Sequence, residues 1–326
     1  MANTPNQKLK QLYLMKILME QSDEEHPMSV KDIIEHLRLY GIAAERKSLY
    51  TDIERLTDFG INVVSQRTNT VGYFVGDRQF ELAELKLMVD AIQSSRFIPV
   101  KQSAALIKKI AALGSVHHAK QLKRQVFVDG QPKTINDSVL YNVDSIHAAI
   151  NGQKKISYKY FDYSAKKRRV YRKDGELYIQ TPVALCWKDD SYYLIAYSAK
   201  HEGFTHYRVD RMSDVSVLDK PRDDFGKERF DVAEYTKKVF GMYSGEIVRA
   251  KLSFDPSLVN VLFDRFGRNI HITEESNGWV TVSVEVSASP VFLGWLFQFG
   301  SRAKIIAPDS LIEIMKNLVS DTAKNY

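Results

Sequence analysis

The stretch ERKSLYTDIERLTDFG, residues 45–60, sets the interpretation of the first part of the chain. At about 100° per residue, Leu49, Ile53 and Leu56 fall on one face of a helix. The opposite face carries Lys47, Thr51, Glu54 and Arg55, and its flanks carry Arg46, Ser48 and Tyr50. Such side chains reach both bases and phosphates, so the stretch is a candidate DNA-recognition helix. The alternative is a charged surface helix, since four acidic residues dilute its positive charge.

The flanking sequence favours the first interpretation. Helical patterns are expected over residues 7–21 and 29–41, with Ser29 and Asp32 in capping-box spacing and Gly41 at the end. Residues 61–77 read as a hairpin around the turn RTNTVG, which begins with Arg67. Three helices followed by a hairpin predict a winged helix-turn-helix over residues 1–78, with Arg67 completing the DNA-binding set.

Charge is unevenly distributed along the 326 residues. Residues 1–78 carry 10 Lys and Arg against 11 Asp and Glu, whereas residues 100–175 carry 16 against 5. A domain without excess positive charge is expected to bind DNA weakly alone, and pairing two copies across a palindrome offsets this. The basic middle of the chain favours an anionic partner, with a solvated basic surface as the alternative.

Composition narrows the class of protein. The single cysteine, Cys186, cannot form an internal disulfide, and no apolar run approaches the length of a membrane helix. We therefore expect a cytoplasmic protein with no membrane partner. Its length predicts several domains.

Residues 79–135 contain two amphipathic helices, expected at 80–94 and 99–113. Glu81 and Glu84 suit the beginning of the first helix. The apolar stripes of the two helices could pack within one chain or against a second copy. We therefore expect residues 79–135 to be a helical linker and a candidate dimerisation region.

Residues 136–222 change to strand patterns after a helix that begins near residue 138. Ile156, Tyr158 and Tyr160 point to one side of a predicted strand. Short strands at this spacing predict a small SH3- or Sm-like β-barrel, with Pro182 at a strand start or bulge and KDDS (188–191) as a hairpin turn.

Residues 223–326 begin with a segment expected to be mainly a surface linker with short helical pieces. Residues 246–322 then show the order strand, helix, strand, strand, helix, strand and a final helix, which predicts a ferredoxin-like βαββαβ domain. The complete chain is therefore expected to be an α+β multidomain protein.

Three motifs resemble one known family. Residues 182–215 resemble a WYL domain, with Tyr192-Tyr193-Leu194 at the signature triplet and Arg208 and Arg211 at the Arg-x-x-Arg segment. Residues 291–315 are similar to the WCX extension that follows WYL domains. Residues 45–56 resemble the recognition segment of the winged helices fused to these domains. The chain departs from the family at Tyr192, where Trp is usual, and at Thr51, where Arg is usual.

The resemblance implies a homodimeric transcriptional regulator that binds a double-stranded DNA operator. It also implies that the WYL domain senses an oligonucleotide or nucleotide-type effector. Tyrosine rings stack on bases and arginines bind phosphates, and a histidine adds a donor whose charge varies near neutral pH. The candidate effector-binding residues are Tyr158, Tyr160, Tyr193, His206, Arg208 and Arg211. The alternatives are that the tyrosines fill the barrel, and that Arg211 pairs with Asp210 or Asp214.

Enzymatic interpretations have less support. We find no Gly-rich phosphate loop, metal-spaced His or Cys cluster, or nucleophile elbow, so no catalytic residue, metal or cofactor is expected. Two alternatives stay open: a non-specific single-strand nucleic-acid-binding protein, and a nucleic-acid-processing enzyme.

Overall fold

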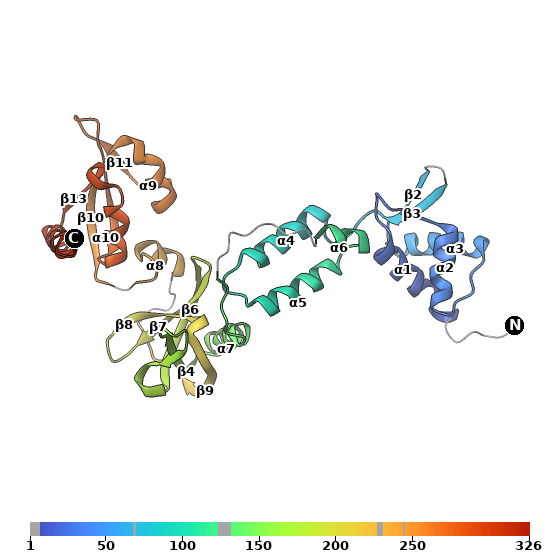
Figure 1. Ribbon diagram of the computed structural model, residues 1–326, viewed down its shortest axis with the longest axis horizontal. Coiled ribbons are helices and arrows are strands. Elements are labelled where there is room, and N and C mark those ends of the chain that lie inside the picture. The colour runs from blue at the N-terminus through green and yellow to red at the C-terminus, as the bar shows by residue number, and fades with distance from the viewer. Residues whose placement is uncertain (1–6, 68–69, 123–131, 227–230, 244) are drawn as a thin grey trace. The chain divides into compact units, whose positions relative to one another are not determined.

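The computed structural model describes residues 7–67, 70–122, 132–226, 231–243 and 245–326. The chain divides into two compact units, residues 1–137 and 138–326, which are described separately. Figure 1 shows the elements of both, from the blue N-terminal helices to the red C-terminal helix. Each unit contains two of the four predicted domains, whose finer boundaries remain predictions.

The first unit opens with three helices and a three-stranded sheet. The helices are α1 (Lys10–Gln21), α2 (Val30–Leu39) and α3 (Arg46–Asp58). Strands β2 (Val63–Arg67) and β3 (Val71–Val75) form the predicted hairpin, and β1 (Met28–Ser29) pairs with the other edge of β3. Strand β1 was not predicted, because a strand of two residues leaves no periodic pattern in the sequence.

The expected start and end of α2 are confirmed. Ser29 and Asp32 form a capping box, and Gly41 after the helix has a φ of +72°. The apolar face of α3 is also confirmed, because Leu49, Ile53 and Leu56 are buried in a core shared with α1 and α2. The opposite face of α3 is left to solvent.

Three further helices complete this unit: α4 (Leu82–Ser94), α5 (Val100–Ala111) and α6 (Val116–Leu122). Glu81 and Glu84 form a capping box at the start of α4. The cluster between the helices buries Leu85, Val89 and Leu122, while Leu87 is 69% exposed. The stripes therefore pack partly within the chain, and their role in dimerisation remains a prediction.

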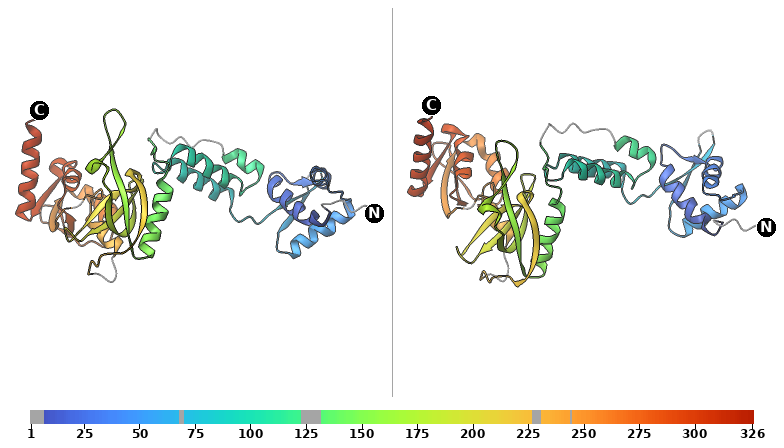
Figure 2. Two further views of the ribbon diagram at one scale, coloured as in Figure 1. Left: turned by 90° about the horizontal axis from the view of Figure 1, so that it is seen from below. Right: turned by 60° about the horizontal axis from the view of Figure 1, so that its bottom comes forward.

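The second unit begins with α7 (Val139–Asn151) and a strongly bent antiparallel sheet, a half-barrel. Figure 2 shows α7 alongside the sheet, and Asn142 donates its amide to the carbonyl of Met212 at 3.0 Å. The strands of this sheet are β4 (Lys154–Tyr163), β5 (Arg169–Tyr171), β6 (Tyr178–Lys188), β7 (Ser191–Ser198), β8 (Gly203–Arg208) and β9 (Met212–Pro221). Strand β4 pairs with β5, β6 and β9, so it is the strand around which the sheet bends.

Two predicted irregularities of this sheet are present. The β6–β7 register shifts between Pro182 and Ala184, which places the predicted bulge. Asp189 and Asp190 both have positive φ in the tight turn of the β6–β7 hairpin. Such a turn explains the two acidic residues without a catalytic role.

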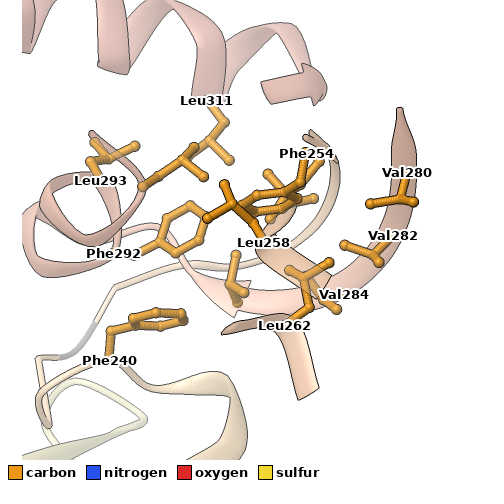
Figure 3. Packing of buried hydrophobic residues seen from close by; sticks show 14 residues of the cluster. Phe240, Phe254, Leu258, Leu262, Val280, Val282, Val284, Phe292, Leu293 and Leu311 are labelled. Atoms are coloured by element: carbon orange, nitrogen blue, oxygen red, sulfur yellow. The ribbon is translucent and has the colours of Figure 1, made fainter. Parts of the chain in front are cut away.

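The C-terminal part shows the predicted order of elements. It contains β10 (Ile247–Phe254), α9 (Val259–Phe266), β11 (Ile272–Glu274), β12 (Val280–Ser287), α10 (Pro290–Phe297), β13 (Ala303–Ala307) and α11 (Asp309–Ala323). The strand order is β11-β12-β10-β13, and all neighbours are antiparallel. Figure 3 shows the core, where Phe254, Phe292 and Leu311 meet the valines of β12.

The preceding segment contains a short helix, as expected, but part of it is not at the surface. Helix α8 (Val232–Lys238) is followed by Val239, Phe240 and Met242, which are 1%, 3% and 4% exposed. This part of the expected surface linker is therefore buried. Its charged neighbours concealed the apolar residues in the sequence.

Candidate nucleic-acid interfaces

The first candidate interface is an open hollow of about 870 Å³ between α2, α3 and the β2–β3 hairpin. Arg46 and Tyr50 enter it from α3, and Arg67 enters it from the end of β2. Lys31 and Arg38 of α2 add two basic side chains, while Asp32 and Glu35 add two acidic ones. The hollow therefore joins three of the predicted DNA-binding residues and keeps a basic excess.

Arg46 is held in a defined position. Its Nε donates to the Tyr50 hydroxyl at 2.8 Å, and the Tyr50 ring lies 6.5 Å from that of Tyr73 on β3. Because the bond uses only Nε, the two Nη groups stay outside it. The Arg46 side chain is thus held in place through Nε, while its two Nη groups can donate to a phosphate or to guanine.

The other predicted residues of α3 differ among themselves. Lys47 and Thr51 are exposed, and Arg55 lies 3.7 Å from Asp52 with its side chain 63% exposed. Ser48 instead accepts a hydrogen bond from Lys10 at 2.9 Å and donates to the carbonyl of Glu45. Lys10 also forms a 2.5 Å ion pair with Asp52, so Ser48 belongs to the contact between α1 and α3.

Sequence reasoning missed Lys31 and Arg38. They are seven positions apart, which places them on one side of α2. That spacing is the signal in the sequence that could have identified them.

The second candidate interface is a cavity of about 420 Å³ in the second unit, which we call the arginine pocket. It brings together five of the six predicted effector-binding residues. The pocket is lined by Tyr160, Arg172, Tyr193, Thr205, His206, Tyr207, Arg208, Arg211, Gly241, Met242 and Tyr243.

Local structure explains why Arg208 and Arg211 share this pocket. Strand β8 ends at Arg208, and residues 209–211 form a single 3₁₀ turn, η3, with Val209 completely buried. Arg208 is the extended residue just before this turn and Arg211 is its last residue, and both side chains line the pocket. The Arg-x-x-Arg spacing thus directs both guanidinium groups to one side.

The three arginines of the pocket are already paired with carboxylates. Arg208 makes two bonds to Asp210, at 3.0 and 2.8 Å, and this pair raises the pKa of its guanidinium. Arg211 and Arg172 both bind Asp162, at 3.1 and 2.6 Å, and the bond from Arg172 lowers the pKa of that carboxyl. Three positive and two negative groups therefore stand at the site, and the charge left for an anion is about one unit.

These pairings correct one expectation and reveal a missed residue. Arg211 pairs with Asp162, not with Asp210 or Asp214. Arg172 follows β5 in the 3₁₀ turn η2 (Arg172–Gly175), where Lys173 and Asp174 have positive φ. Its position depends on a backbone path that the sequence pattern could not supply.

The structure also corrects the effector-binding role expected of Tyr158. Its ring is completely buried and stacks on Tyr178 at 5.5 Å, so it packs the half-barrel and offers no face to a ligand. Tyr160 borders the pocket while its hydroxyl accepts the N–H of Arg208 at 3.1 Å. Tyr193 lies opposite Arg208 in the β7–β8 register, with the guanidinium 5.9 Å from its ring. Both rings are thus held beside the arginines.

His206 also differs from its expected behaviour. Burial lowers its pKa to about 4, so the ring is neutral near pH 7. It hydrogen-bonds the backbone of Met242, and its Nε2 lies 3.0 Å from the Tyr235 hydroxyl. A neutral ring that donates to the carbonyl and accepts from the tyrosine satisfies both contacts. The expected change of charge near neutral pH is therefore wrong.

Tyr192, the first residue of the signature triplet, contacts a residue on the neighbouring strand of the β6–β7 hairpin. Tyr192 is directly opposite Trp187 in the β6–β7 register, and their rings meet edge to face at 4.7 Å. Trp187 therefore packs against the position where the family usually has tryptophan.

Two further properties concern the residues that the structure describes. Within them, no helix is long and apolar enough to cross a membrane. The same residues contain no group of three or more His, Cys, Asp or Glu side chains suited to hold a metal ion.

Comparisons with known proteins identify the domains of the second unit. The WYL domain family model matches residues 141–217, and the WCX domain family model matches residues 246–323. The chain thus contains a WYL domain followed by a WCX domain. The arginine pocket is built mainly from the WYL domain.

A curated relative spans nearly the complete chain. The "Uncharacterized HTH-type transcriptional regulator YobV" of Bacillus subtilis (strain 168) is 22% identical over 332 residues, covering 98% of this chain and 99% of the relative. Its name places a helix-turn-helix and transcriptional regulation in that protein.

Two solved structures are distant matches. "Proteasome accessory factor B/C (PafBC) of Arthrobacter aurescens" is 16% identical with a TM-score of 0.29, and the chain spans 50% of its length. A "CRISPR Cas-related protein" is 14% identical with a TM-score of 0.37, with 90% of this chain and 77% of that chain covered. Scores this low carry no information about function.

Proposed function

We propose that this protein is a sequence-specific DNA-binding transcriptional regulator that acts in the cytoplasm as a homodimer. The hollow between α2, α3 and the hairpin carries this proposal, because it joins Arg46 and Tyr50 of the recognition helix to Arg67 of the wing. Lys47 and Thr51 stand exposed on the same helix, available for base edges. The relative from Bacillus subtilis supports the same class of function.

The second part of the proposal concerns the WYL domain. The arginine pocket would bind an anionic effector of the oligonucleotide or nucleotide type. Arg172, Arg208 and Arg211 would contact phosphate, while the rings of Tyr160 and Tyr193 lie beside them for stacking. Because the pocket has an excess of only about one positive charge, affinity would depend on stacking as well as on charge.

Selection from a random duplex pool tests the DNA-binding part. The full chain should enrich one motif made of two inverted half-sites, since two copies read two half-sites. Recovery of duplexes without a shared motif would contradict sequence-specific regulation. Preferential recovery of single strands in a competition would favour the non-specific single-strand-binding alternative, and strand cleavage during incubation would favour the enzyme.

A double variant tests the effector part. Arg208→Ala with Arg211→Ala should weaken binding of a short fluorescent oligothymidylate at least tenfold, measured by fluorescence anisotropy. Affinity for the selected duplex should remain nearly unchanged. The matched control is Arg249→Ala with Arg268→Ala, which removes the same charge at two exposed positions outside the pocket. Equal binding by the pocket variant and the wild type would refute the assigned pocket.

A further inference from the structure

The segment formed by residues 239–243, which we call the strap, lies between the WYL and WCX domains. The N–H of Tyr243 donates to the carbonyl of Phe240 at 3.0 Å, closing a tight turn. Gly241 and Met242, at its centre, have φ values of +54° and +58°. This conformation is uncommon for a residue other than glycine, so surrounding contacts must hold Met242 in it.

One side of the strap belongs to the core of the C-terminal domain. The Phe240 ring lies 5.0 Å from Phe292 and 5.3 Å from Trp295, both on α10. Figure 3 shows Phe240 beside Phe292. The Arg265 guanidinium on α9 stacks 3.5 Å from the Phe240 ring. Any shift of Phe240 therefore disturbs α9 and α10 together.

The other side of the strap belongs to the WYL domain. Met242 packs with Ala184 and Ile195 of the half-barrel, and its backbone bonds with His206. Gly241, Met242 and Tyr243 form a wall of the arginine pocket. A ligand in the pocket therefore touches residues whose immediate neighbour is fixed in the C-terminal core.

The strap is also closely fitted to α10. A Cβ added at Gly241 would lie 3.1 Å from the Val291 side chain. Lys238, just before the strap, bonds to Glu285 of β12 at 2.7 Å. These contacts join the strap to the C-terminal domain at three points: α9, α10 and β12.

We infer that the strap transmits occupancy of the arginine pocket to the C-terminal domain, so that ligand binding stabilises α9 and α10. This inference rests on the proposed effector binding. A ligand shifts such an equilibrium only if it binds the two states differently. Here the difference would come from contacts of the ligand with Met242 and Tyr243. These two residues line the pocket only when the strap packs against the half-barrel.

Backbone hydrogen exchange of the full chain tests the inference, with and without saturating oligothymidylate. Exchange in α10 should slow several-fold when the probe binds, although α10 contributes no residue to the pocket. Exchange in α2, which belongs to the other unit, serves as the internal control. Slower exchange confined to the pocket residues, with α10 unchanged, would overturn the inference while leaving effector binding intact. If the probe does not bind at all, the effector proposal fails first.

Variants of Phe240 give a second readout, because this residue lines no part of the pocket. Phe240→Ala should bind the probe nearly as well as the wild type but lose the slowing in α10, whereas Phe240→Leu should restore most of it. Full protection of α10 in Phe240→Ala would also contradict transmission through the strap. If Phe240→Ala does not fold, the wild-type measurement still decides.

Discussion

At the scale of the residue, the environment of a side chain decides its role more than its type does. Tyr158 and Tyr160 are two positions apart on β4, yet the first is completely buried and the second borders the arginine pocket. Strand alternation correctly placed both on one side of the sheet. It could not indicate how far along the strand the core ends and the pocket begins.

The lowered pKa of His206 should make the stability of the second unit depend on pH. Its pKa of about 4 in the folded chain lies below the ordinary value of 6.5, so the unfolded chain binds the proton more readily. The contribution of His206 to stability is therefore complete above pH 6.5 and is lost as pH falls toward 4. Allowing for partial exposure, lowering the pH from 7 to about 4.5 should cost about 2 kcal/mol at this site.

Urea unfolding measured by tryptophan fluorescence checks this value, because Trp187, Trp279 and Trp295 all lie in the second unit. His206→Gln should lose about 2 kcal/mol less stability over this pH range than the wild type. His201→Gln, at an exposed position, is the control and should behave as the wild type. An identical pH dependence for wild type and His206→Gln would show that the histidine is not held neutral.

At the scale of the element, the capping box of α2 has a measurable effect. Ser29 Oγ accepts the N–H of Asp32 at 3.2 Å, and the Asp32 carboxylate accepts the N–H of Ser29. Ser29→Ala should destabilise α2 by about 1 kcal/mol, seen as faster backbone hydrogen exchange in that helix. The control Ser65→Ala, at an exposed position of β2, should change the stability of α2 by less than about 0.5 kcal/mol. Equal exchange in the two variants would contradict the cap.

The elements that the sequence predicted well have strong local signals. The capping residues of α2, the apolar face of α3 and the alternating strands of the C-terminal domain are all visible within short windows. The strap is different, because Phe240 and Met242 stand in a polar segment and are buried with residues distant in sequence, such as Phe292 and Ile195. Arg172 is similar, since its place beside Asp162 depends on the turn after β5.

At the scale of the whole molecule, the proposed DNA binding and the proposed effector binding belong to different units. The first contains the hollow proposed to bind DNA and helices α4, α5 and α6, and the second contains the arginine pocket, the strap and the C-terminal sheet. The order of domains could be predicted from three motifs in sequence. The pairing of Arg172 and Arg211 with Asp162 could not, because Asp162 lies on β4 and both arginines lie in turns outside that strand.

The central claim is that the exposed face of α3 reads base sequence, and exchange of one residue on it is the most direct test. Thr51 is exposed on α3, and an arginine there can bind guanine with two hydrogen bonds. Motifs should be selected from the same random duplex pool with the wild-type chain and with Thr51→Arg. We predict two-fold motifs with the same half-site spacing, altered at the base pairs beneath α3 in favour of guanine. Identical motifs from both chains, or no motif from either, would contradict the assignment of α3 as the reading helix.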